Sequence, residues 1–150
     1  MKLASHLHRL GNDIVACYLV DTAEGITLID AGLPGHWRDL QRELRSLGKS
    51  VNDIRGLVLT HGDSDHIGFA ERLRSAHGVP VFVHAADAVR TRTGEKPKVT
   101  AGPIRPGPTL DSLDRIAGLP ASWVLPGHGA PWRTSPDRVR QAVQPHPFTT

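Results

Sequence analysis

The sequence predicts a mixed α/β fold, and three observations support that prediction. Residues 3–30 contain three short apolar runs separated by turn-forming stretches at 11–13 and 22–25. Residues 36–47 place apolar side chains at helical spacing. Beyond residue 56, short apolar runs alternate with helix-like segments. The chain therefore alternates strands and helices and belongs to neither an all-helical nor an all-β class.

The N-terminal part is expected to begin with strands at 3–10, 14–21 and 26–30. Because tight turns join them, an antiparallel meander is the simplest arrangement. The second run is nearly all apolar, as in a strand buried on both faces. The helix at 36–47 then packs its apolar stripe into the core, and Gly48 ends it.

The same patterns continue through the rest of the chain. Residues 93–108 contain four Pro and three Gly without periodicity, which predicts an irregular loop. The other expected elements are a strand at 57–60, a helix at 66–77, a strand at 80–84, a short helix at 85–92, a helix at 110–117, a strand at 122–125 and a last helix from Ser135.

A cluster of four side chains with metal-binding atoms lies where the strand at 57–60 gives way to a helix. These side chains are His61, Asp63, Asp65 and His66. Strand alternation points His61 and Asp63 the same way, and the other two open the helix. An Asp at a helix start is commonly an N-cap, which is the alternative for Asp65. Two His and a second Asp beside it favour a metal site.

This cluster resembles the His-x-His-x-Asp-His motif of the metallo-β-lactamase superfamily, with Asp63 in place of the second His. Two further stretches resemble family motifs in order and spacing. Residues 26–32 end in Asp-x-Gly, and residues 123–129 contain Gly-His-Gly. The resemblance covers residues 3–143 and implies an αββα sandwich that acts as a metal-dependent hydrolase on a small-molecule substrate.

The resemblance also implies a role for each site residue. Asp65 is expected to bind metal and to orient the attacking water, which makes it the catalytic residue. Asp30, which could otherwise be a turn-forming Asp before Gly32, is expected to hold a ligand His in orientation. The implied metal ligands are His61, Asp63, Asp65, His66 and His128.

The chain departs from the family between the cluster and His128. Family members normally carry a segment there with a third metal-binding His and an Asp that bridges two metals. The only histidines of this interval, His77 and His84, stand in other contexts. The sandwich is therefore expected to be truncated in its second half, by an internal deletion near residues 93–108.

The departure affects the two implied metal positions differently. One position keeps Asp65, His66 and His128, and three protein ligands with an open position are typical of catalytic zinc. The other keeps only His61 and Asp63, which is too few for tight binding. We therefore expect one zinc per chain. A carboxylate in place of an imidazole also lessens the preference for zinc over manganese or iron.

Composition limits the class of protein. The length of 150 residues suits a single domain over 1–150, and 39% hydrophobic with 22% charged residues is ordinary for a globular chain. No apolar run approaches the roughly 20 residues that span a bilayer. Residues 1–6 lack the apolar core of a signal peptide. The single cysteine, Cys17, excludes an internal disulfide and is expected to be buried. A cytoplasmic location is expected.

The charge distribution and the expected loss of strands indicate which binding partners the chain has. The net charge is +3, and the basic residues are scattered without interleaved aromatics. This pattern favours a solvated surface over a nucleic-acid patch, and neither a nucleic acid nor a membrane is expected as a partner. A shortened sheet leaves edges and apolar faces less covered, so a homo-oligomer is expected.

Metal-activated water is thus the expected nucleophile, acting on an ester, thioester, lactone or phosphodiester. Neither a Gly-x-Ser-x-Gly motif nor a Gly-rich phosphate loop is present. The alternative is a degenerate, non-catalytic domain with at most one weak metal site. An RNA-processing nuclease is disfavoured because the chain lacks a basic aromatic surface.

Overall fold

The structure, a computed structural model, describes residues 1–94, 121–135 and 138. It divides into two compact units. The first comprises Met1–Lys98 with Pro126–Ala130, and the second comprises Val99–Leu125 with Pro131–Thr150. In the second unit, strands β7 (Trp123–Val124) and β8 (Trp132–Arg133) pair antiparallel. A single domain over 1–150 stays a prediction.

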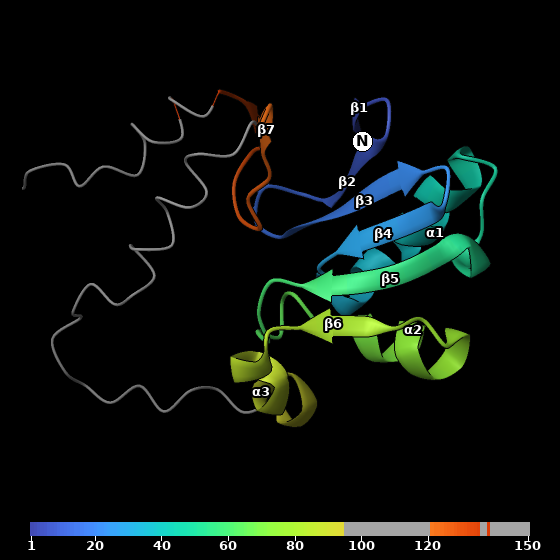
Figure 1. The fold of residues 1–150 in the computed structure, drawn as a ribbon, viewed down its shortest axis with the longest axis vertical. Helices are drawn as coiled ribbons and strands as arrows, with labels where there is room; N and C mark the ends of the chain where they lie inside the picture. The colour runs from blue at the N-terminus through green and yellow to red at the C-terminus, as the bar shows by residue number, and fades with distance from the viewer. Residues whose placement is uncertain (95–120, 136–137, 139–150) are drawn as a thin grey trace, which may run out of the picture. The chain divides into compact units, whose positions relative to one another are not determined.

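The first unit is built on a six-stranded sheet in the order β1-β2-β3-β4-β5-β6 (Figure 1). The first four strands pair antiparallel, as the predicted meander requires, but the single strand predicted at 3–10 is two strands, β1 and β2, joined by a turn at residues 5 and 6. The last two run parallel to β4, so the carboxyl ends of β4, β5 and β6 meet at one edge. The strands are β1 (Lys2–Ala4), β2 (Leu7–Gly11), β3 (Ala16–Thr22), β4 (Gly25–Ile29), β5 (Ile54–Leu59) and β6 (Val81–Val83).

Helices α1 (Trp37–Ser46) and α2 (Ala70–His77) cover the same face of this sheet and lie behind it in Figure 1. Each is the crossover between two parallel strands, α1 between β4 and β5 and α2 between β5 and β6. Helix α3 (Ala88–Thr93) follows β6. Single 3-10 turns occupy Pro34–His36, Val51–Asp53 and Ala85–Asp87. No helix in the described part of the chain is long and apolar enough to cross a membrane.

The core lies between the sheet and these two helices. Strand alternation sends Leu19, Leu28 and Leu57 to this face, where they pack with Leu40 of α1 and Leu73 of α2 in one buried cluster. These side chains are fully removed from water, so their burial is the main stabilising term of the unit.

Cys17 belongs to the same core, in line with its position in an apolar run. Burial, and then the neighbouring charges of Asp30 and Asp39, raise the pKa of its thiol to about 12. The thiol therefore stays protonated at neutral pH and is a poor nucleophile.

The helix predicted at 66–77 begins only at Ala70, which corrects the placement of Asp65 and His66 at a helix start. The backbone explains the difference. After a local turn in which His66 and Ile67 N–H donate to the Asp63 carbonyl, Gly68 N–H donates to the Gly32 carbonyl and Phe69 N–H to the Ala31 carbonyl, so the helical hydrogen-bond pattern is interrupted before Ala70. Asp65 and His66 consequently lie on an irregular segment.

Other predicted elements agree to within a few residues or lie outside the described residues. The short helix predicted at 85–92 is the 3-10 turn at 85–87 followed by α3. The strand predicted at 122–125 is β7. The loop after residue 94, the helix at 110–117 and most of the last helix from Ser135 lie outside the described residues.

The sheet face opposite the two helices carries an exposed apolar row. The register aligns Ile29, Val58 and Phe82 across β4, β5 and β6. Val58 is 39% exposed and Phe82 57% exposed, which is unusual for adjacent large apolar side chains in a sheet.

We expect this row to drive self-association, because burying it against a second copy removes apolar surface from water. Phe82→Lys should lower the weight-average mass measured by sedimentation equilibrium at high protein concentration. Val89→Lys is the matched control. Val89 is an exposed apolar residue too, at 65% exposure, but it lies on α3 and not in the sheet row. A wild-type chain that stays monomeric throughout contradicts the expectation.

Candidate metal centre

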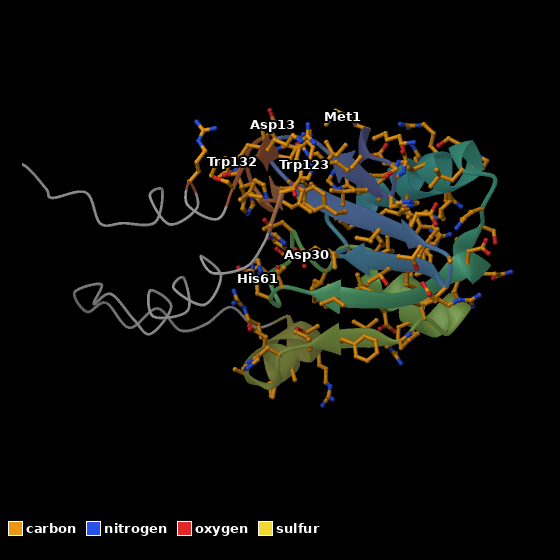
Figure 2. The ribbon with its side chains drawn as sticks, turned by 45° about the horizontal axis from the view of Figure 1, so that its top comes forward. Met1, Asp13, Asp30, His61, Trp123 and Trp132 are labelled. Carbon is orange, nitrogen blue, oxygen red and sulfur yellow. The ribbon has the colours of Figure 1, made fainter. Side chains whose placement is uncertain are left out.

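The candidate site lies at the edge where the parallel strands end. Asp30 directly follows β4, and His61 lies two residues beyond the end of β5. Figure 2 shows both side chains at the same end of the sheet. Parallel strands bring such residues together although 30 positions separate Asp30 from Thr60, whose backbone N–H donates to the Asp30 carboxylate.

His128 reaches this edge because the segment that carries it is fixed to the β2–β3 hairpin. Ala16 N–H donates to the Gly127 carbonyl at 2.8 Å, and Gly129 N–H donates to the Asp13 carbonyl at 2.7 Å. The Tyr18 hydroxyl donates to the Pro126 carbonyl at 2.7 Å.

Gly127 allows the segment to approach closely. A Cβ at this position would lie 2.5 Å from Cε1 of the His66 ring, which is inside van der Waals contact. His128 thereby lies next to His66 although 62 positions separate them.

Three side chains converge with the spacing of metal ligands. Nε2 of His66 lies 3.3 Å from Nε2 of His128, and Oδ2 of Asp65 lies 3.6 Å and 3.4 Å from these two nitrogens. Tetrahedral zinc with bonds of about 2.0–2.2 Å requires ligand atoms about 3.3–3.6 Å apart. Among the described residues, this is the group of three or more acidic, His or Cys side chains that fits one ion.

The hydrogen bonds of both rings leave the facing nitrogens free. Nδ1 of His128 donates to the Ile14 carbonyl at 2.5 Å, and a carbonyl can only accept. Nδ1 of His66 donates to Oδ2 of Asp30 at 2.8 Å. With Nδ1 as the donor, the neutral form of each ring presents an Nε2 lone pair to the other. Two lone pairs at this distance repel unless a cation lies between them, so the donor set fits a metal ion.

Asp30 is held as an orienting carboxylate. It is buried, and besides His66 it accepts hydrogen bonds from Thr60 N–H and from the Thr60 hydroxyl, both at 2.8 Å. Its backbone has a φ of 62°, in the left-handed region that Asp tolerates better than most residues. Strain of this kind persists where surrounding contacts enforce it, as at functional sites.

We expect Asp30→Asn to lower zinc affinity by roughly 10- to 100-fold, because the neutral amide supports the His66 N–H less well. Asn also tolerates the left-handed backbone, so the fold should be retained. A competition titration with a chromophoric chelator measures the affinity, and thermal melting checks the fold. Asp39→Asn, which alters an acidic side chain on α1, is the control. Equal zinc affinities for the two variants would rule out an orienting role for Asp30.

His61 lies beside this group without completing it. Its ring centroid is 4.1 Å from that of His66, and its Nδ1 is 2.9 Å from the Thr60 hydroxyl oxygen. Burial, and then the neighbouring His66, lower the pKa of His61. Its Nε2 lies 3.2 Å from Oδ2 of Asp63.

Asp63 is paired mainly with a cation. Its Oδ1 forms an ion pair with Nη2 of Arg90 on α3, and Arg90 also lies 3.9 Å from Asp87. A guanidinium on one oxygen lowers the carboxylate's electron density and thus its strength as a metal ligand. The structure therefore brings together Asp65, His66 and His128, and places His61 and Asp63 next to them in other contacts.

Sequence reasoning missed three partners of the site. Thr60 holds Asp30, the Ile14 carbonyl fixes the His128 tautomer, and Arg90 neutralises Asp63. Of these three, only Thr60 could have been found from the sequence, because it is a hydroxyl residue directly before the His-Asp cluster. Backbone carbonyls and a distant Arg leave no mark in a local sequence pattern.

The first unit thus combines an α/β sheet with two His and one carboxylate near the carboxyl ends of its parallel strands, a group that could hold a metal ion. The sequence model of the Metallo-beta-lactamase superfamily matches residues 10–108. The chain belongs to this superfamily, as its motifs predicted.

Curated relatives agree with this assignment. The probable metallo-hydrolase YflN of Bacillus subtilis is 26% identical over 139 residues, covering 83% of this chain and 53% of YflN. The uncharacterized protein YobT of the same organism is 41% identical over 78 residues, covering 52% of this chain and 30% of YobT. A hydroxyacylglutathione hydrolase of Hahella chejuensis is 33% identical over 94 residues, covering 55% of this chain and 37% of that enzyme. The chain thus spans about half or less of the length of these relatives.

Solved structures show the same fold. A metallo-beta-lactamase of Cronobacter sakazakii with a HARLDQ motif is 28% identical, with a TM-score of 0.57 over 64% of this chain and 39% of that one. The metallo-beta-lactamase GOB-18 of Elizabethkingia meningoseptica is 29% identical, with a TM-score of 0.57 over 63% of this chain and 35% of that one. The predicted mixed α/β fold of the metallo-β-lactamase type is confirmed.

Proposed function

We propose that this chain is a metal-dependent hydrolase in which Asp65, His66 and His128 hold one divalent ion, with zinc as the preferred metal. The observation that carries the proposal is the pair of Nε2 atoms 3.3 Å apart, each with its Nδ1 committed to an acceptor. Two imidazoles and one carboxylate form a common ligand set of catalytic zinc. The same set also suits iron, and the carboxylate suits manganese.

When bound, such an ion acts as a Lewis acid that lowers the pKa of water toward 7 and polarises a substrate oxygen. The protein supplies orientation. Asp30 and the Ile14 carbonyl hold the two rings so that both Nε2 lone pairs face the same point. Asp65 directs Oδ2 toward that point, which leaves its second oxygen as an acceptor for a proton of the attacking water.

Exposure indicates the side from which a substrate approaches. The His66 side chain is only 2% exposed, whereas that of His128 is 61% exposed. The site is therefore closed beneath His66 and open beside His128. An ester, thioester, lactone or phosphodiester placed there would present its carbonyl or phosphoryl oxygen from the solvent side.

The substrate panel begins with thioesters, because one relative carries the name hydroxyacylglutathione hydrolase. We expect the zinc-loaded chain to hydrolyse at least one ester, thioester, lactone or phosphodiester, and chelation to remove that activity. Asp65→Asn should lower kcat strongly, whereas Asp39→Asn on α1 should leave it unchanged. Activity that survives both chelation and Asp65→Asn would contradict the proposal.

The second candidate is a non-catalytic domain with one metal. The observation that favours it is the Arg90–Asp63 ion pair, which occupies a carboxylate at a position implied to bind metal. Stoichiometric zinc binding without hydrolysis of any substrate on the panel would support this candidate over the first.

A further inference from the structure

A pocket of about 710 Å³ is lined by residues of α2, β6 and α3 and by Ile67, and none of Asp65, His66 and His128 lines it. About half of its wall is apolar, and that half comes from Ile67, Ala70, Val81, Val83 and Ala88. A volume of this size falls within the range of small-molecule pockets in proteins, about 300–1,000 Å³. Neither the metal chemistry nor the hydrophobic core uses this space.

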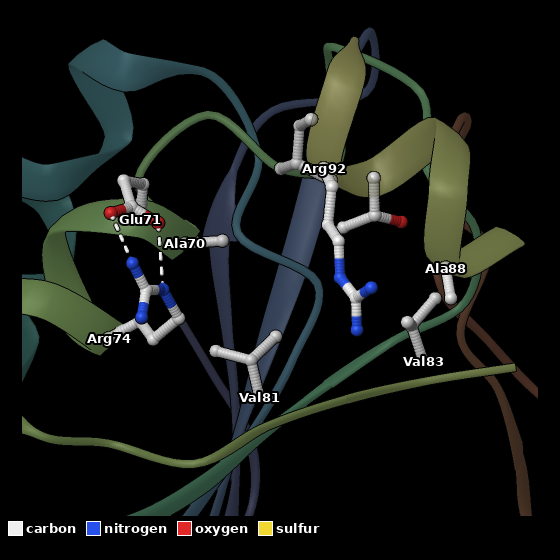
Figure 3. A pocket seen from close by; sticks show the side chains of 9 residues that line it. Ala70, Glu71, Arg74, Val81, Val83, Ala88 and Arg92 are labelled. Atoms are coloured by element: carbon white, nitrogen blue, oxygen red, sulfur yellow. Dashed lines mark hydrogen bonds and ion pairs between the residues drawn. The ribbon is translucent and has the colours of Figure 1, made fainter. Parts of the chain in front are cut away.

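One uncommitted cation reaches into the pocket. Figure 3 shows the Arg92 side chain extending between Val81 on one side and Val83 and Ala88 on the other. Within the described part of the chain, no ion pair or hydrogen bond is formed by this guanidinium.

The other charged groups at the pocket are already paired. Arg74 binds Glu71 through two hydrogen bonds of 2.9 Å and 2.7 Å. Arg90, on the same helix as Arg92, pairs with Asp63 and lies near Asp87. The described lining therefore carries a net charge of +1, from Arg74 and Arg92 against Glu71.

From this arrangement we propose that the pocket binds a monoanionic carboxylate with an aliphatic tail. The planar guanidinium of Arg92 matches a carboxylate through two parallel hydrogen bonds. The five apolar side chains offer the tail an apolar contact surface beside the polar part of the wall. A dianion is disfavoured because only one cation is uncommitted, and a cation is disfavoured by the net charge.

Isothermal titration calorimetry of the whole chain with octanoate tests the proposal. We expect saturable binding that weakens as methylenes are removed from the tail, by up to about fourfold for each one. Arg92→Gln should weaken octanoate binding roughly tenfold or more, since a charge-assisted pair is lost. Arg45→Gln, which neutralises an exposed arginine on α1, should have no effect. No octanoate binding, or equal affinity in Arg92→Gln and wild type, overturns the proposal.

Two further measurements locate the ligand. Arg92→Glu should lose octanoate and gain octylammonium, because the sign of the uncommitted charge is reversed. Zinc-loaded and chelator-treated protein should bind octanoate equally, because the pocket contains none of the metal-binding atoms. Binding that disappears on chelation would show that the carboxylate binds the metal, and the proposal fails.

Discussion

Replacing His128 by Ala should abolish tight metal binding, whereas His61→Ala should weaken it only in part. His128 supplies one of three ligand atoms that lie within 4.8 Å of one another, and two remaining protein ligands are too few for tight binding. His61 contacts the His66 ring but is not part of that group. Its removal should loosen the packing around His66 without removing a ligand.

Competition against a chromophoric chelator measures both affinities under the same conditions. His84→Ala serves as a control, because His84 caps the 3-10 turn at 85–87 and lies outside the ligand group. We expect no measurable zinc binding by His128→Ala at concentrations that saturate the wild type. The reverse order, with His61→Ala losing all metal and His128→Ala losing none, would show that the ligands are assigned wrongly.

Gly68→Ala is expected to cause a large loss of stability. A Cβ at Gly68 would lie 2.4 Å from the Gly32 carbonyl oxygen and 2.5 Å from the Pro34 nitrogen. These are backbone atoms, and they are held close by the hydrogen bond from Gly68 N–H to the Gly32 carbonyl. The two loops must separate, at a cost of about 3 kcal/mol in the free energy of unfolding.

The separation also affects the site, because these loops carry Asp30 and His66. Urea denaturation followed by circular dichroism, on metal-free protein, isolates the effect on folding. Gly35→Ala is the matched control, since a Cβ there meets nothing within 4 Å. Equal unfolding midpoints for the two variants would mean that the close approach of the loops does not stabilise the fold.

The periodicity of the sequence predicts most of the first unit. Strands β2 to β4 and helix α1 follow from local alternation and helical spacing, because each buries one face against the same core. The start of α2 could not be predicted this way. Gly68 and Phe69, directly before it, donate hydrogen bonds to residues 32 and 31, and a local sequence pattern does not predict such long-range bonds.

The candidate site, too, was predicted from local sequence only in part. The closeness of Asp65 and His66 follows from their positions in the chain, but their meeting with His128 was predicted only through the resemblance to the superfamily. The structure supplies the physical reason, since Ala16 and Asp13 hold the glycines on either side of His128. Residue type alone predicts Asp63 as a metal ligand, but its carboxylate forms an ion pair with Arg90 from a later helix.

Metal content per chain tests the central claim most directly. The protein is purified without chelator, dialysed against zinc, and analysed by elemental mass spectrometry together with X-ray absorption at the zinc edge. The predicted result is one zinc per chain with two nitrogen ligands from imidazoles and an oxygen ligand from Asp65. Two zinc equivalents per chain, or a single zinc that persists unchanged in His128→Ala, would contradict the assignment of Asp65, His66 and His128 as the metal site.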